Sequence, residues 1–191
     1  ESLAAHLSEP VRNYGIGGYS VYQAYLRMLR EEQRAPARYI IFNIFDDDHA
    51  RNLHGWQRFK FGVNRKSPSP TVPHLTVDLD AGRITDRPNP CPTVQSVHDL
   101  CDLDRVYSMF RDDFYLHNRL HWAARKANGE SVPARDYDDQ RLMKHGIFAS
   151  TRIIDRVNEF ASKNAKHIIE NVPFGSWKIP LNFKETATGG T

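Results

Sequence analysis

The chain has 191 residues, of which 40% are hydrophobic and 11% aromatic, and its 26 basic and 23 acidic side chains leave a net charge of +3. This length suits one domain that can bury a core, and so balanced a charge does not favour nucleic-acid binding. No apolar run approaches the ~20 residues that a membrane-spanning helix needs. We therefore expect one globular domain over residues 1–185 with a disordered tail at 186–191, no nucleic-acid partner and no membrane span.

The N-terminal third predicts alternating strands and helices. The expected elements are the end of a helix at 1–8, a strand at 11–14, a glycine turn at 15–18, a helix at 20–34 and a strand at 39–45. Ser20 is a plausible N-cap for the helix, whose apolar residues recur at helical spacing. Strand, turn, helix and strand in this order form a βαβ unit, which implies parallel strands.

The glycine turn is the first candidate for a ligand-binding backbone. Gly15, Gly17 and Gly18 permit positive φ angles and the close approach of another group. The dinucleotide fingerprint needs a third glycine three residues after the second, where this chain has Ser20. We therefore expect no cofactor. Free N–H groups at the start of a helix can instead stabilise an oxyanion.

A dense group of charges follows the strand at 39–45: Asp46, Asp47, Asp48, His49 and Arg51. The apolar run before it suits a strand buried on both faces of a parallel sheet, and ligands bind at the carboxyl ends of such strands. Aspartates in this place also cap the next helix. Both interpretations, a functional site and a helix cap, remain open from this stretch alone.

The rest of the chain adds an insertion, two long helices and a further strand. We expect an insertion at 53–92 outside the core with a hairpin at 74–84, helices at 96–127 and 136–165, and a strand starting at 167. His117 and His121 have metal-compatible spacing but lack the glutamate of a zinc-protease helix, so no metal is expected. Cys91 and Cys101 either form one disulfide or remain free thiols.

Residues 13–20 and 45–52 together resemble two conserved blocks of the SGNH (GDSL) hydrolases. The resemblance implies a flavodoxin-like three-layer α/β/α sandwich with a parallel sheet. It also implies hydrolysis of an ester of a small molecule, lipid or carbohydrate by serine acyl transfer. Gly18 matches the glycine whose N–H belongs to the oxyanion hole, and Asp47 falls on the asparagine that completes it. Asp46, Asp48, His49 and Arg51 would then form the substrate-binding rim.

Two other blocks of that family find no match. The Gly-Asp-Ser block with the nucleophile and the Asp-x-x-His block with the base are missing, and Asp46-x-x-His49 fits the second only in the wrong place. We expect the serine and the base to lie outside the given residues. An ionised Asp47 would repel an oxyanion, so it either stays protonated beside its acidic neighbours or marks a site repurposed for binding.

Two alternatives follow from that departure. The first is a non-catalytic protein of the same fold that binds a carbohydrate or acyl ligand. The second is a metal-dependent hydrolase in which Asp46, Asp47, Asp48 and His49 hold Mg²⁺ or Mn²⁺, since hard oxygen ligands suit these ions.

Overall fold

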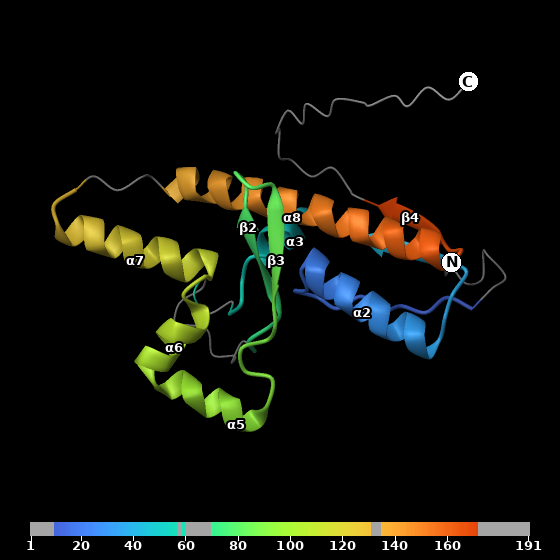
Figure 1. The fold of residues 1–191 in the computed structure, drawn as a ribbon, viewed down its shortest axis with the longest axis horizontal. Helices are drawn as coiled ribbons and strands as arrows, with labels where there is room; N and C mark the ends of the chain where they lie inside the picture. The colour runs from blue at the N-terminus through green and yellow to red at the C-terminus, as the bar shows by residue number, and fades with distance from the viewer. Residues whose placement is uncertain (1–9, 57–58, 60–69, 131–134, 172–191) are drawn as a thin grey trace, which may run out of the picture.

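The structure, a computed structural model, describes residues 10–56, 59, 70–130 and 135–171 (Figure 1). It is a mixed α/β fold. Its elements are α2 (Val21–Arg34), β1 (Tyr39–Asn43), α3 (Asp46–Arg51), β2 (His74–Asp78), β3 (Arg83–Arg87), α5 (Val94–Val97), the 3₁₀ helix η1 (His98–Cys101), α6 (Leu103–Phe110), α7 (Phe114–Ala127), α8 (Arg135–Lys163) and β4 (His167–Asn171). The helix end expected at 1–8 and the tail at 186–191 lie outside the described residues.

Helix α2 confirms the helix expected at 20–34. The Ser20 hydroxyl accepts a hydrogen bond from the Gln23 N–H at 3.1 Å, and the Gln23 side chain accepts one from the Ser20 N–H at 3.4 Å. Both residues are buried, so this capping box fixes the start of the helix inside the protein. Val21 and Tyr22, the next two residues, belong to the core.

Strands β1 and β4 pair in parallel, with Ile41 opposite Ile169. This pairing confirms the strands expected at 39–45 and from 167. Phe42 is buried and faces the core, but Tyr39 and Ile41 on the other face are 47% and 44% exposed. The expectation that this strand is buried on both faces is therefore wrong, because the described helices cover only one face of the pair.

Residues 11–14 form no strand. Val11 and Tyr14 are exposed, and the stretch is held by a hydrogen bond from the Arg12 guanidinium to the Ala35 carbonyl oxygen at 3.2 Å. A strand needs a partner for its backbone groups, and no ladder reaches this stretch within the described residues. In place of the expected strand, these residues form an irregular segment that leads into the glycine turn.

The β2–β3 hairpin confirms the hairpin expected at 74–84. Gly82 supplies the positive φ of +62° that its turn requires. Leu75 on β2 is 1% exposed and lies in the same core cluster as Leu53, which is 2% exposed. The expectation that the insertion stays out of the core is wrong here, because the hairpin packs against α8 in the centre of the molecule (Figure 1).

The single helix expected at 96–127 is divided into α5, η1, α6 and α7. Asp102 interrupts it first, since its carboxylate accepts hydrogen bonds from two amides at the start of α6 at 2.9 and 3.2 Å. The Asp113 carboxylate likewise accepts hydrogen bonds from two amides at the start of α7, at 2.9 and 3.1 Å. Apolar residues keep their helical spacing across both breaks, so this periodicity does not indicate where the caps lie.

Helix α8 confirms the helix expected at 136–165, and one side of it packs into the core. Ile153 and Val157 on it are fully buried. An ion pair between Arg156 and Asp86 at 2.9 Å joins this helix to the hairpin. Cys91 and Cys101 are both free thiols. No helix among the described residues is long and apolar enough to cross a membrane.

Candidate functional site

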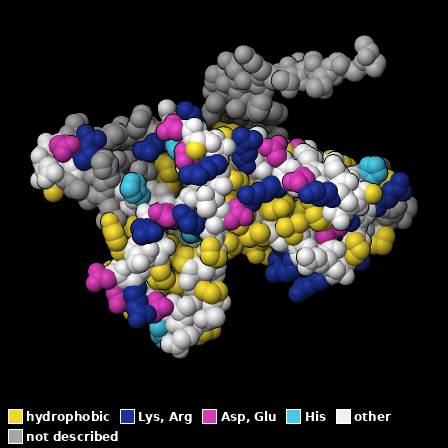
Figure 2. Space-filling model, viewed as in Figure 1, with side chains coloured by type: hydrophobic (Ala, Val, Ile, Leu, Met, Phe, Trp, Pro, Cys, Tyr) yellow, Lys and Arg dark blue, Asp and Glu magenta, His cyan; other side chains and the backbone are white. Residues whose placement is uncertain are grey.

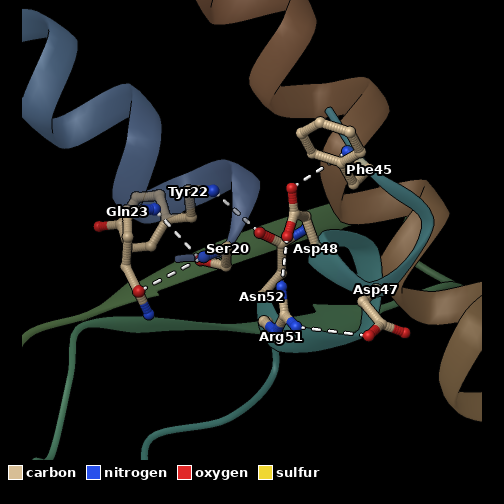
Figure 3. A network of polar contacts seen from close by, with 8 residues as sticks. All are labelled: Ser20, Tyr22, Gln23, Phe45, Asp47, Asp48, Arg51 and Asn52. Carbon is tan, nitrogen blue, oxygen red and sulfur yellow. Dashed lines mark hydrogen bonds and ion pairs between the residues drawn. The ribbon is translucent and has the colours of Figure 1, made fainter. Parts of the chain in front are cut away.

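The acidic turn follows β1 directly, as the sequence predicted. Ile44 is fully buried, Phe45 is 60% exposed, and α3 begins at Asp46. The Phe45 N–H donates a hydrogen bond to the Asp48 carboxylate at 3.0 Å (Figure 3). Asp48 therefore caps the start of α3, which is the structural interpretation that the sequence left open.

Arg51 joins two carboxylates on the same helix. Its guanidinium lies 2.5 Å from an Asp48 oxygen and 3.4 Å from an Asp47 oxygen (Figure 3). The Asp48 side chain is 16% exposed, whereas that of Asp47 is 76% exposed. Asp48 is thus held in place from two sides, whereas the Asp47 side chain is exposed and pairs with Arg51 near the surface.

Asn52, at the end of α3, connects three helices. Its side-chain oxygen accepts a hydrogen bond from the Tyr22 N–H at 2.9 Å (Figure 3). Its side-chain NH₂ donates to the Ser150 hydroxyl at 2.9 Å and to the Gly146 carbonyl at 3.3 Å. Asn52 is fully buried. The end of the acidic turn is therefore tied to α8 and to the second residue of α2.

Gly18 lies in the turn that leads into α2. Its φ angle is +86°, a conformation that residues with a side chain rarely adopt. The residue is exposed and is followed after one residue by the buried cap Ser20. Because the bond between Tyr22 and Asn52 fixes the start of α2 against the end of α3, the glycine turn and the acidic turn are held on one framework.

His49 lies on the side of α3 that faces α8. Its Nδ1 is 2.7 Å from the Ser150 hydroxyl oxygen, and the Ser150 hydroxyl also lies 3.0 Å from the Gly146 carbonyl oxygen. That carbonyl can only accept, so a hydroxyl that donates to it leaves His49 Nδ1 as the donor. The remaining ring nitrogen, Nε2, is then the basic one.

Burial lowers the pKa of His49, although the carboxylates of Asp46 and Asp48 act in the opposite direction. The imidazole is therefore neutral near pH 7. Ser150 is only 1% exposed, so its hydroxyl is not accessible to a substrate despite the histidine beside it. The contact between Ser150 and His49 orients the imidazole and does not resemble an exposed nucleophile with its base.

Gly146 lets α8 approach α3 at van der Waals distance. A Cβ atom at this position would lie 2.5 Å from the His49 carbonyl oxygen and 2.7 Å from its carbon. Gly146, Ser150 and Asn52 were not among the residues predicted for this site. The small residues at 146, 149 and 150 share one side of a long helix, and this pattern is the signal that indicates a close helix contact.

The predicted site residues thus fall into two groups. Asp46, Asp48, His49 and Arg51 are partly buried on α3, whereas Gly18 and Asp47 are exposed. Among the residues that the structure describes, no three His, Cys, Asp or Glu side chains are placed to hold a metal ion. The metal-dependent alternative built on Asp46, Asp47, Asp48 and His49 therefore finds no support in this geometry.

Comparisons of the chain with protein-family models, with curated proteins and with solved structures found no match.

Proposed function

We propose that this chain is part of an SGNH/GDSL-type hydrolase that acts on an ester of a small molecule, lipid or carbohydrate by serine acyl transfer. The observation that supports it most is the buried bond between Tyr22 and Asn52 at 2.9 Å. It joins the second residue of α2, just after the first stretch that resembles the family, to the last residue of the second stretch, 30 residues further along the chain. Two matching blocks on one rigid framework are what an oxyanion pocket requires.

The proposed fold is a flavodoxin-like three-layer sandwich. Its support is the parallel pairing of β1 with β4, with helix α2 before β1 and α8 before β4. Tyr39, Ile41 and Ile169 leave one face of this pair apolar and exposed. Parallel sheets are normally covered on both faces, so further strands and a second helical layer would complete the sandwich.

In this proposal the Gly18 N–H and the side chain at position 47 stabilise the oxyanion of the tetrahedral intermediate. Asp46, Asp48, His49 and Arg51 form the rim that contacts the substrate. Ser150 is too buried to act as the nucleophile. The nucleophilic serine and its histidine base are proposed to come from outside the described residues, as the family pattern requires.

The test is turnover of p-nitrophenyl acetate by the full-length protein, with and without a serine-directed phosphonate. We expect turnover that the phosphonate abolishes. Gly18→Ala should lower it about 10²–10³-fold, because the left-handed turn that orients the N–H is strained by a Cβ atom. Gly17→Ala is the matched control, since a Cβ there meets nothing within 4 Å. Turnover that resists the phosphonate would contradict the proposal.

A second candidate is a non-catalytic protein of the same fold that binds a carbohydrate or acyl ligand. The exposed ion pair between Asp47 and Arg51 at 3.4 Å favours it, because an ionised carboxylate cannot donate to an oxyanion. Asp47→Asn separates the two. A strong gain in turnover would show that the native aspartate opposes catalysis, whereas unchanged or reduced turnover would support a protonated donor.

A further inference from the structure

A second site lies away from the acidic turn, where β2 and the start of α7 meet α8. It is an open cavity of about 110 Å³. Leu53, Leu75 and Val77 form an apolar wall, and the first two of these are almost fully buried. Polar side chains line the rest of it: Asp112, His117, Arg141 and His145. An apolar wall with a few convergent polar groups is typical of small-ligand sites.

The described lining of the cavity contains one carboxylate, Asp112, and one guanidinium, Arg141. Asp112 is paired with Arg87 at 2.8 Å, so its charge is compensated. Arg141 lies over the Phe114 ring, 5.7 Å from its centroid, and has no carboxylate partner among the residues whose side chains the structure describes. A guanidinium in this situation presents unused donors to a ligand. An anion is therefore the favoured occupant.

His145 adds a hydrogen-bond acceptor beside that cation. Its Nδ1 lies 2.8 Å from the Arg141 carbonyl oxygen, which can only accept, so Nδ1 carries the proton. Burial, together with the nearby charges of Arg141 and Lys144, lowers the pKa of His145 and outweighs this hydrogen bond. The ring is thus neutral near pH 7, and its Nε2 can accept a hydrogen bond from a donor on a ligand.

We propose that this cavity binds inorganic phosphate, with Arg141 donating to phosphate oxygens and His145 Nε2 accepting from a P–OH group. The volume of the cavity suits a small ligand, because about 110 Å³ is less than the ~150 Å³ of a cavity that holds benzene. Phosphate carries a hydroxyl at pH 7 and sulfate does not, so the neutral histidine gives the site a preference between them. This site does not depend on the proposed hydrolase activity.

The experiment is a titration of the labelled protein with phosphate and with sulfate at pH 7, followed by NMR signals of Phe114 and His145. We expect saturable shifts with phosphate. Arg141→Gln should weaken binding about tenfold or more, since charged hydrogen bonds are lost. The matched control is Arg152→Gln, which removes the same charge from the same helix at an arginine paired with Asp155. Circular dichroism confirms that each variant is folded.

His145→Phe tests the second half of the proposal. This substitution keeps a ring beside Phe114, which lies 5.3 Å away between centroids, and removes the Nε2 acceptor together with the Nδ1 donor to the Arg141 carbonyl. The wild type should prefer phosphate over sulfate by about tenfold, and the variant should lose that preference. Absence of saturable shifts, equal affinity of the wild type for both anions, or equal weakening by Arg141→Gln and Arg152→Gln would each overturn the proposal.

Discussion

The two sides of α3 are held by different kinds of interaction. On one side, His49 and Asn52 lie against α8 and α2 in a network of neutral hydrogen bonds. On the other, the Asp47 side chain is 76% exposed and forms an ion pair with Arg51 at 3.4 Å. Charge makes the aspartates conspicuous in the sequence, yet the neutral polar residues fix where the turn lies.

The energetic weights explain this difference. A buried polar group left without its partner costs about 1–3 kcal/mol, whereas an exposed ion pair contributes roughly 0–1 kcal/mol. Asn52 is fully buried with three hydrogen bonds, and the Asp47 side chain is 76% exposed. The exposed side can therefore change its chemistry with little effect on folding, which is the situation expected of a functional surface.

The largest expected effect is on the buried side. Asn52→Ala leaves the Tyr22 N–H without its side-chain acceptor, removes one donor each from the Ser150 hydroxyl and the Gly146 carbonyl, and should lower the free energy of unfolding by about 3 kcal/mol. Urea denaturation measures the loss. Asn158→Ala is the control, because the side chain of this exposed asparagine donates to the exposed Glu170 carboxylate. Similar losses for the two variants would remove the distinction between the two sides.

The helix contact at Gly146 should be nearly as sensitive. Gly146→Ala places a Cβ 2.5 Å from the His49 carbonyl oxygen, so the backbones must separate. We expect a loss of about 2 kcal/mol in thermal or urea unfolding, despite the gain of up to ~1 kcal/mol in helix propensity. Gly17→Ala, in open space, should change little. A stabilised Gly146→Ala variant would show that the helices are not in close contact.

One contribution to the pH dependence of stability comes from His49. Its pKa in the folded protein is lowered from 6.5, so below about pH 6.5 the unfolded chain takes up the proton first. The stability contributed by the neutral ring is fully present above that pH and is lost as pH falls toward the lower folded value. His49→Gln should therefore flatten the pH profile of unfolding in this range. His98→Gln, at an exposed histidine, is the control variant.

The smallest effect is expected on the open side. Asp47→Asn should change the free energy of unfolding by no more than about 0.5 kcal/mol, and salt should reduce even that change. Asp48→Ala provides the contrast, because it removes the acceptor of the Phe45 N–H and should cost about 1 kcal/mol. If chemical denaturation showed that Asp47→Asn lowers the free energy of unfolding more than Asp48→Ala does, the exposed side would contribute to stability after all.

Much of the local structure could be predicted because its causes lie within a few residues. Ser20 caps the helix through Gln23, three residues on, and Gly82 turns a hairpin whose strands follow each other directly. The apolar run at 39–45 predicted β1, and the acidic turn was placed correctly at its end. Asp102 and Asp113 were missed because a cap inside a periodic stretch looks like any polar residue on a helix.

The sequence by itself determined helices α2 and α8, strands β1 and β4, the β2–β3 hairpin and the position of the candidate turn, since propensity, capping and periodicity act over a few residues. Only the tertiary structure decided that residues 11–14 form no ladder with the described strands, that one face of β1 is exposed and that Asn52 joins three helices. The bonds from Asn52 reach Gly146 and Ser150, 94 and 98 residues further along the chain. Contacts at such separations depend on how the elements pack, and no pattern within one element carries that information.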